Sequence, residues 1–145
     1  RRVLCQSLYP AEGIETWEAS TQYVRESIEH YSAWWYPYPY PVCSNVNGPE
    51  YGMEYPMIVF CGGRNSAESL WGVTTHEVGH TWFPMVVNND ERRHAWRDEG
   101  FNTFINYYAT QEIHPEFESR RGDVGKYVAA NPETIWQPII MAAVA

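Results

Sequence analysis

The chain of 145 residues is poor in basic residues, and it has no long apolar run. Ten lysines and arginines stand against eighteen aspartates and glutamates, which gives a net charge of -8. Because nucleic-acid binding needs a basic face, we expect no nucleic-acid partner. No stretch reaches the roughly 18 apolar residues of a membrane span, and no apolar signal region follows Arg1 and Arg2. The compartment stays open, with a periplasmic or secreted location slightly favoured over a cytoplasmic one.

Cysteine is also scarce. Cys5, Cys43 and Cys61 include no Cys-x-x-Cys pair, so we expect no thiolate zinc site. Three cysteines cannot all pair within one chain. We therefore expect buried free thiols, with a single disulfide as the alternative.

Apolar and aromatic residues, in contrast, are plentiful. The hydrophobic fraction of 44% and the aromatic fraction of 16% suit one globular domain with a sizeable core. So many aromatic residues indicate either a stacked core or surfaces that normally contact something else. The sequence stops inside an apolar stretch, residues 139–145. We therefore expect it to be part of a longer protein.

The first half of the sequence predicts one helix and two strands. Residues 16–35 carry an apolar stripe at helical spacing, made of Trp17, Thr21, Val24, Ile28, Tyr31 and Trp35. The Tyr-Pro repeats of residues 36–41 end this helix and form a rigid connector or, alternatively, a polyproline ligand. Residues 42–47 and 57–61 are β-prone and predict short strands.

The second half predicts three more helices. One runs over residues 66–83, with Asn65 as N-cap in a capping box and Pro84 as the stop. Another begins near Asp98, and its apolar face consists of Phe101, Phe104, Ile105 and Tyr108. A further helix over residues 117–130 is weakened by two glycines. The expected fold class is α+β with helices dominant.

The segment His76-Glu77-Val78-Gly79-His80 lies inside the helix expected over residues 66–83. Residues four apart on a helix differ by only about 40° and rise about 6 Å, so both imidazoles can reach one zinc ion at about 2.0–2.1 Å. Glu77 is turned by about 100° from His76, where it can accept a proton from a water on the metal. By chance, this motif would occur in roughly 2% of chains of this composition.

A catalytic zinc site needs a third protein ligand and one open position. Glu99 follows His80 after eighteen residues. We therefore expect one Zn²⁺ per chain, held by His76, His80 and Glu99, with Glu77 as the general base. The other histidines belong to no such ligand pattern, and they are expected to be surface or capping residues. They are His30, His94 and His114.

His-Glu-x-x-His followed by eighteen residues and Glu is the signature of the aminopeptidase N family of zinc metallopeptidases, which are gluzincins. The chain resembles this family also in Trp82-Phe83 and in Glu99-Gly100-Phe101. Its Tyr51-Gly52-Met53-Glu54-Tyr55 stands where the family has Gly-x-Met-Glu-Asn, and departs from that motif at Tyr51 and Tyr55. The variant Gly-Met-Glu-Tyr-Pro is similar to that of some bacterial relatives. The resemblance covers most of residues 14–110.

The resemblance implies a thermolysin-like catalytic domain, of which residues 1–145 would be a single partial domain. Residues 1–64 would hold a helix, short strands and the Gly-Met-Glu segment, and residues 65–145 the helical zinc-binding part. Glu54, with Gly52 and Met53, would bind the free amino terminus of a peptide substrate; a water-facing turn residue is the alternative for Glu54. An oxyanion-stabilising tyrosine would lie beyond Ala145, and an N-terminal β domain and a C-terminal helical domain would be missing.

Two further residues near the motif have open interpretations. Asp98 either accepts the spare N–H of a zinc-bound histidine and fixes its tautomer, or caps the helix that begins near it. Gly79 within a helix costs about 1 kcal/mol relative to alanine. Close approach of another segment would explain it.

The predicted activity is zinc-dependent hydrolysis of peptide bonds, with release of N-terminal residues. Two alternatives remain at this point. One is a zinc endopeptidase in which Glu54 does not read the terminus. The other is a zinc-binding but catalytically incomplete fragment, or an interaction domain.

Overall fold

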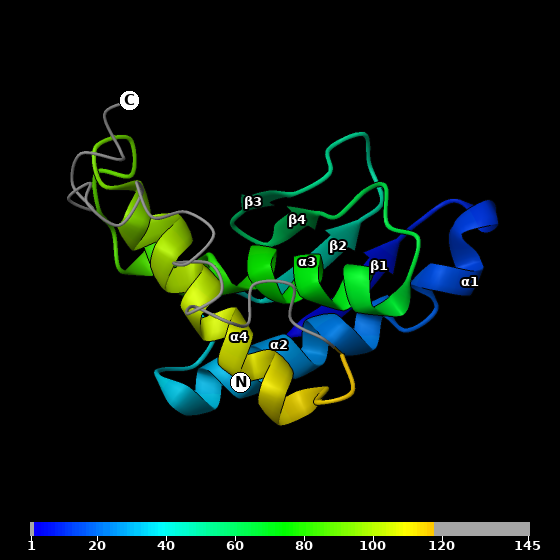
Figure 1. Cartoon of the computed structure of the whole chain (residues 1–145), viewed down its shortest axis with the longest axis horizontal. Helices are drawn as coiled ribbons and strands as arrows, with labels where there is room; N and C mark the ends of the chain where they lie inside the picture. Colours follow the sequence, from blue (N-terminus) through cyan, green and yellow to red (C-terminus); the bar gives the residue numbers. More distant parts are fainter. Residues whose placement is uncertain (1, 118–145) are drawn as a thin grey trace, which may run out of the picture.

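The computed structural model describes residues 2–117, in which a small sheet packs against a set of helices (Figure 1). The strands are β1 (Leu4–Leu8), β2 (Val42–Val46), β3 (Met53–Tyr55) and β4 (Ile58–Phe60). The helices are α1 (Ile14–Trp17), α2 (Ser20–Trp34), α3 (Ala67–Gly79) and α4 (Phe101–Ile113). Three short helical turns join them: η1 (Ala11–Gly13), η2 (Thr81–Val86) and η3 (Trp96–Gly100). This mixed, helix-rich architecture confirms the expected α+β class.

The sheet has the strand order β1-β2-β4-β3. β1 and β4 both run parallel to β2, whereas β3 is antiparallel to β4. β2 and β4 confirm the strands expected over residues 42–47 and 57–61. β1 and β3 were not predicted, because their partners are distant or their runs are short: Leu4 pairs with Val42, and β3 spans three residues. Both form edges of the sheet, so β3 has one free edge among the described strands.

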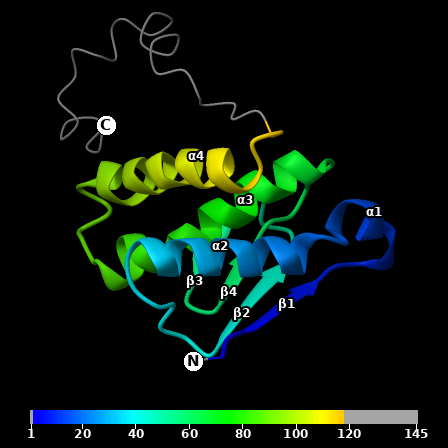
Figure 2. The ribbon, with the colours of Figure 1, turned by 90° about the horizontal axis from the view of Figure 1, so that it is seen from below.

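The helices form two layers over the sheet. α2 contacts β1 and β2, and α3 contacts β3 and β4. α4 packs on α3 and α2, which separate it from the strands (Figure 2). Within residues 2–117, no helix is long and apolar enough to cross a membrane. The helix predicted over residues 117–130 lies almost wholly outside the described residues.

The single helix predicted over residues 16–35 was wrong in one respect, because the chain turns at Glu18 and Ala19 between α1 and α2. Four members of the predicted stripe are buried, namely Trp17, Val24, Ile28 and Tyr31. Thr21 is exposed, and Trp35 is 38% exposed. Thr21 lies in the first turn of α2, next to this break, and Trp35 lies just past the end of α2, where the backbone has left helical geometry.

The core is built largely from aromatic rings. Trp17, Tyr31, Trp71 and Trp82 are each no more than 1% exposed. Tyr31 on α2 stacks on Trp35 and meets Trp82 edge-on, while Trp71 on α3 meets Tyr23. The stacked core thus takes up six aromatic residues, whereas seven others among residues 2–117 are at least 36% exposed. All three cysteines are free thiols; Cys43 and Cys61 are buried and Cys5 is half-buried.

α3 begins and ends differently from the prediction. Its N-cap is Ser66, not Asn65, and the Ser66 hydroxyl accepts a hydrogen bond from the Ser69 N–H at 3.1 Å. Regular helix ends at Gly79, four residues before the expected end. The backbone then widens through η2, where Phe83 leaves helical geometry at φ −134° and ψ 111°. Pro84 explains this, because the residue before a proline avoids the helical region.

The apolar face predicted for α4 was also wrong. Ile105 is buried, but Phe101, Phe104 and Tyr108 are 43–59% exposed. The side that faces α3 instead carries Asn102 and Thr110 beside Ile105 and Ala109. Polar groups of α3 therefore meet polar groups of α4 across the interface.

Candidate metal centre and active site

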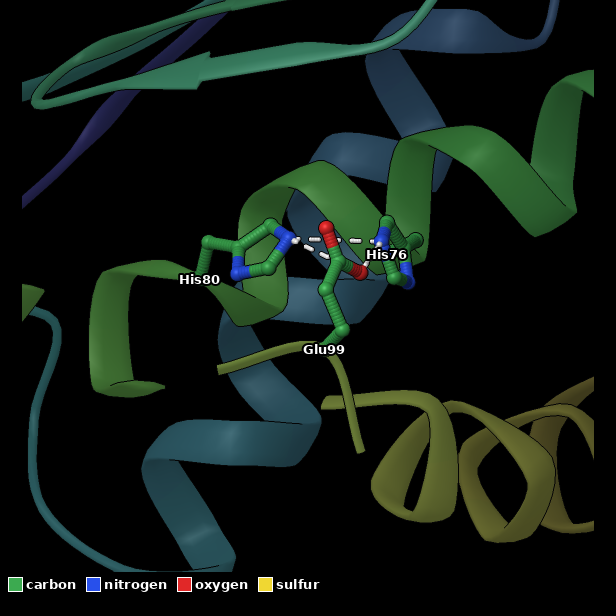
Figure 3. A group of neighbouring side chains, drawn as sticks. All are labelled: His76, His80 and Glu99. Atoms are coloured by element: carbon green, nitrogen blue, oxygen red, sulfur yellow. Dashed lines mark hydrogen bonds and ion pairs between the residues drawn. The ribbon is translucent and has the colours of Figure 1, made fainter. Parts of the chain in front are cut away.

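The last turn of α3 and the turn η3 bring together His76, His80 and Glu99 (Figure 3). His76 Nε2 lies 3.2 Å from His80 Nε2 and 3.1 Å from Glu99 Oε2. His80 Nε2 lies 3.9 Å from the same carboxylate oxygen. The three side chains that the sequence predicted as ligands thus point at one another from two separate segments.

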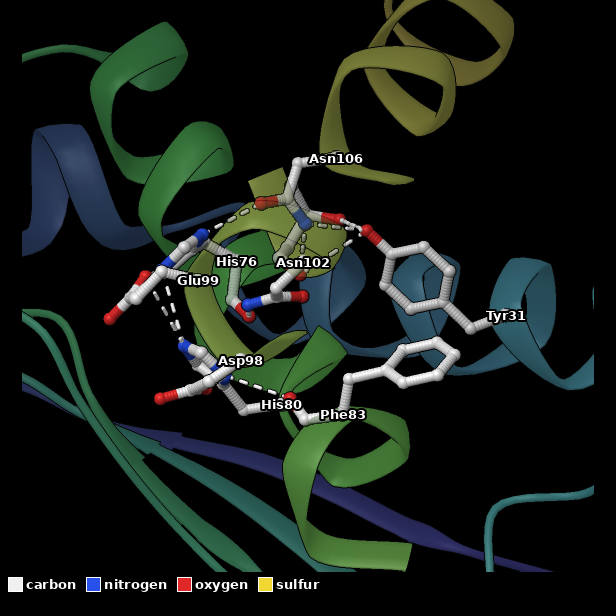
Figure 4. Close-up of polar contacts among 9 residues, drawn as sticks. Tyr31, His76, His80, Phe83, Asp98, Glu99, Asn102 and Asn106 are labelled. Atoms are coloured by element: carbon white, nitrogen blue, oxygen red, sulfur yellow. Dashed lines mark hydrogen bonds and ion pairs between the residues drawn. The ribbon is translucent and has the colours of Figure 1, made fainter. Parts of the chain in front are cut away.

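The other nitrogen of each imidazole is already in a hydrogen bond (Figure 4). His76 Nδ1 lies 2.7 Å from Asn106 Oδ1. His80 Nδ1 lies 2.9 Å from the Phe83 carbonyl oxygen and 2.9 Å from Asp98 Oδ1. All three of these partners are acceptors, so each Nδ1 carries the hydrogen and donates it. When a ring is neutral, its Nε2 therefore carries the lone pair and directs it toward its neighbour.

With both rings neutral, the two Nε2 lone pairs 3.2 Å apart repel each other unless a proton or a metal ion lies between them. The three ligand atoms form a triangle whose corners are equidistant from a point about 2.0 Å away, which matches the ~2.0–2.1 Å that separates zinc from nitrogen and carboxylate ligands. The donor set of two imidazoles and one carboxylate is that of a catalytic rather than a thiolate site. These residues therefore fit a single divalent cation.

Carboxylates give the surroundings of His80 a negative potential. Burial alone would lower the pKa of the His80 imidazole, but the contact with Asp98, the charge of Glu54 and the Phe83 carbonyl together raise this pKa to about 9. Glu54, His80 and Asp98 offer ligand-type atoms within 4.8 Å of one another. Positive charge on or beside the His80 ring is therefore favoured.

Glu77 follows His76 on α3 but points to a different side. It belongs to neither group of metal-ligand side chains that residues 2–117 assemble. Its side chain is buried, and burial raises the pKa of the carboxyl to about 7 against the opposing effect of His76 and His80. A Cβ on Gly52 would lie 2.7 Å from Glu77 Oε1, so the backbone of residue 52 covers the carboxylate. Glu77 is a carboxylate poised to exchange a proton near neutral pH.

The Gly-Met-Glu segment runs along this site. Glu54 lies in strand β3, half-buried and beside His80, which differs from a turn residue that faces water. Met53 is half-buried on the same strand, and Gly52 lies just before it against Glu77. The structure thus brings Gly52 and Glu54 beside residues of the metal centre, and Met53 lies between them in the chain.

Asp98 lies against the His80 ring rather than at a helix terminus. Its Oδ1 is 2.9 Å from His80 Nδ1, although the N–H is aligned with the Phe83 carbonyl. α4 begins at Phe101 with Gly100 as N-cap, so Asp98 does not cap that helix. The contact with His80 is therefore present, and a role of Asp98 in fixing the tautomer of this histidine stays a prediction.

A buried polar network behind His76 was not predicted. The Asn106 amide accepts from His76 and donates to the Tyr31 hydroxyl at 2.9 Å and the Thr75 carbonyl at 3.2 Å. The Tyr31 hydroxyl also lies 2.8 Å from Thr75 Oγ1. Because the amide must accept at Oδ1 and donate at Nδ2, its orientation is fixed. Asn106, on α4, therefore connects the His76 ring to α2 through Tyr31 and to the backbone of α3 through Thr75.

Asn102 makes the second contact between α4 and the metal-binding turn. Its Nδ2 donates to the His76 carbonyl at 2.7 Å. A Cβ on Gly79 would collide with Asn102 Oδ1, which confirms the close approach expected at that glycine. Asn102 and Asn106 are four residues apart on α4, so they share a face. In the sequence, the signal for this polar contact was a pair of asparagines four residues apart in a helix predicted to be apolar.

The three remaining histidines are all half-buried, and His114 is the C-cap of α4, in line with the capping role expected for some of them. His30 contacts Trp34 and lies 3.8 Å from Glu112, while His114 lies 2.9 Å from Glu26 and 3.0 Å from Glu116. These pairs connect α2 with α4 and its end. None of these residues belongs to a ligand-type group among residues 2–117.

A groove of about 560 Å³ opens beside the metal centre. Its floor is α3, which contributes Glu68, Gly72, Val73, His76 and Glu77. One wall comes from the loop before β3, and the other from α4 and Glu99. A ligand in the groove would therefore lie directly against His76, Glu77 and Glu99.

Comparison with known proteins agrees with this geometry. The model of the peptidase family M1 domain matches residues 18–137. The chain is 27% identical over 96 residues to aminopeptidase M1 of Arabidopsis thaliana, which covers 57% of this chain and 11% of that protein. It is 31% identical over 64 residues to endoplasmic reticulum aminopeptidase 1 of Homo sapiens, with 42% of this chain and 7% of that protein covered.

A third relative is aminopeptidase 2, mitochondrial, of Saccharomyces cerevisiae, which is 37% identical over 46 residues, or 32% of this chain and 5% of that protein. The chain thus spans only a small part of the length of the curated relatives it matches. The family match, however, covers most of the 145 residues and includes both histidines and Glu99. By that match, the chain belongs to peptidase family M1.

Proposed function

We propose that the chain is the metal-binding part of a zinc aminopeptidase with a thermolysin-like catalytic domain, of which residues 1–145 form one partial domain. The observation that carries this proposal is the convergence of His76 Nε2, His80 Nε2 and Glu99 Oε2 within 3.1–3.9 Å of one another, with both Nδ1 atoms held by acceptors. Imidazole and carboxylate ligands with an open position suit zinc in a hydrolase.

A zinc ion held by these residues would supply Lewis acidity toward the scissile carbonyl and a water molecule. Glu77 accepts the proton that the attacking water loses and passes it to the leaving amine. Its burial and its raised pKa of about 7 suit a group that must both take and return a proton. The Asn106 amide and the Phe83 carbonyl, with Asp98 beside it, keep the two imidazoles oriented while this occurs.

Glu54 is proposed to bind the free amino terminus of the substrate. Its carboxylate lies within 4.8 Å of ligand-type atoms of His80 and Asp98 and is half-buried, so an ammonium group there would be paired with little competition from water. The strand that carries Glu54 has a free edge among the described strands, with which an extended peptide can pair. The pairing of Glu54 with an ammonium group favours the chain terminus over internal peptide bonds.

Substitution of Glu77 tests the assignment of the base. Glu77→Gln keeps the size of the side chain but removes its ability to accept a proton. We expect the variant to bind one equivalent of zinc and to lose hydrolysis of aminoacyl anilides by several orders of magnitude. Metal content and hydrolytic activity are both measured on the full-length natural protein. Activity retained in Glu77→Gln would contradict the assignment.

Blocking the substrate separates the two kinds of peptidase. An N-acetylated peptide should resist hydrolysis while the free peptide is cleaved at its first bond, because only the free one presents a cation to Glu54. Equal cleavage of both would indicate an endopeptidase. Zinc at one equivalent without hydrolysis of either would indicate a binding domain or an incomplete enzyme. The further domains, the peptide substrate and a periplasmic or secreted location remain predictions.

A further inference from the structure

The groove beside the metal centre extends along α3 away from His80. Its floor runs from His76 back to Glu68, which is about 12 Å at 1.5 Å per residue. Arg64 precedes α3 at this end of the helix and lines the groove together with Tyr51. Glu54, in contrast, lies at the other end of the site, next to His80 and Asp98.

The positions of Glu54 and Arg64 on opposite sides of the metal centre set the direction of a bound peptide. This inference rests on the proposed function. With the substrate amino terminus at Glu54 and the scissile bond at the metal centre, the leaving part of the peptide must extend past His76 into the groove. The residues that follow the scissile bond therefore approach Arg64.

Arg64 is the one lysine or arginine among the described residues that line the groove. Its Nη2 donates to the carbonyl of Tyr51, and its Nε is buried without a hydrogen-bond partner within residues 2–117. No carboxylate of the same residues lies within ion-pair distance of its guanidinium. A buried, unpaired donor on a cation is costly, and a carboxylate accepting from it would remove that cost.

The distance to the reacting centre is short. The Arg64 guanidinium contacts the carbonyl of residue 51, and the next residue, Gly52, covers the carboxylate of Glu77. Summed over these contacts and standard backbone dimensions, the guanidinium lies within about 10 Å of Glu77. An extended peptide advances about 3.3 Å per residue, so this span corresponds to at most about three residues.

We propose that Arg64 binds a carboxylate located two or three residues after the scissile bond. That carboxylate is either the C-terminus of a tripeptide or tetrapeptide, or an acidic side chain at the same position of a longer peptide. Glu68 lines the same groove and repels an anion there, so it limits the preference that Arg64 creates.

A ladder of alanine peptides of two to six residues, each as a free acid and as a C-terminal amide, tests this proposal. In the zinc-loaded protein in its longest natural form, kcat/KM for the acid should exceed that for the amide by about tenfold at three or four residues, and the two should be equal at six. Amide-capped hexapeptides with aspartate at the second or third position after the scissile bond distinguish the two sources of the carboxylate. A preference for these peptides extends the proposal to side chains, and no preference confines it to C-termini.

Variants of the groove report on Arg64 itself. Arg64→Gln should lower the acid-to-amide ratio to about one, Arg64→Lys should keep part of it, and Glu68→Gln should raise it. Arg25→Gln removes an exposed arginine on α2 and should leave the ratio unchanged. A wild-type ratio near one at every length, or an unchanged ratio in Arg64→Gln, would overturn the proposal. If the wild type hydrolyses no peptide at all, the proposed function fails instead, and binding of the acid and amide tripeptides by calorimetry then decides the role of Arg64.

Discussion

Replacing Asn106 with alanine removes the acceptor that holds the ring of His76. In the native chain this amide accepts from His76 Nδ1 at 2.7 Å and donates to the Tyr31 hydroxyl and the Thr75 carbonyl. Without it, the ring can rotate or shift its hydrogen to Nε2, and either change removes a lone pair from the metal centre. We therefore expect zinc affinity to fall.

The magnitude follows from the hydrogen bond that the substitution removes from the His76 ring. Removing such a bond behind a metal-binding histidine lowers metal affinity by about 10- to 100-fold, which is about 1.4–2.8 kcal/mol. The Tyr31 hydroxyl keeps Thr75 as a partner, so the fold should survive with a decrease of about 1–3 kcal/mol in unfolding free energy. Asn106→Asp keeps an acceptor for His76 and should restore most of the zinc affinity.

The assay is competition for zinc with a chromogenic chelator, supported by the visible spectrum of the cobalt-substituted protein. Asn102→Ala is the matched control, because it removes a buried amide from the same face of α4 that contacts the backbone of His76 but not its ring. It should lower stability without lowering zinc affinity. Equal zinc affinities in Asn106→Ala and Asn102→Ala would refute the reasoning, as would an Asn106→Asp variant as weak as the alanine variant.

Two further predictions concern the helix and the thiols. Gly79→Ala should lower the free energy of unfolding, measured in urea, by about 1–3 kcal/mol, because the new Cβ meets Asn102. Gly72→Ala should raise it by up to about 1 kcal/mol, because a Cβ there has nothing within 4 Å. The opposite order of the two variants would contradict the packing described. Cys5 should react with iodoacetamide first in the folded chain at pH 8, because burial raises the pKa of Cys43 to about 12 and also raises that of Cys61. All three thiols should react in urea, as followed by mass spectrometry, and early labelling of Cys61 would count against its burial.

The metal-binding residues were predictable because they depend on local geometry. His76 and His80 share a helix face by the period of the helix alone. Glu99 required the eighteen-residue spacing of a known family, since no local pattern shows where a distant segment returns. Strand β1 was missed for the same reason, because its pairing with β2 joins residues 38 apart, as in Leu4 and Val42.

The errors on α3 and α4 have specific physical causes. Asn65 and Ser66 are both good N-caps, and sequence alone does not select between neighbours. The apolar residues of α4 were assigned to its buried face, yet the buried Asn102 and the half-buried Asn106 satisfy polar groups of α3 that hydrocarbon side chains would leave unpaired. Exposed positions then carry Phe101, Phe104 and Tyr108. The demands of the metal-binding turn thus override hydrophobic patterning.

The separation of the ligands along the chain has a mechanical consequence. A metal ion that joins His80 to Glu99 closes a loop of eighteen intervening residues, much as a disulfide would, and a disulfide across about 15 residues contributes about 3 kcal/mol by restricting the unfolded chain. The two histidines are fastened from behind by Asn106 and Phe83, whereas the Glu99 side chain is 60% exposed. The ion would therefore cross-link the end of α3 to η3, and its departure would leave these two segments joined by protein contacts alone, among them that of Asp98 with His80.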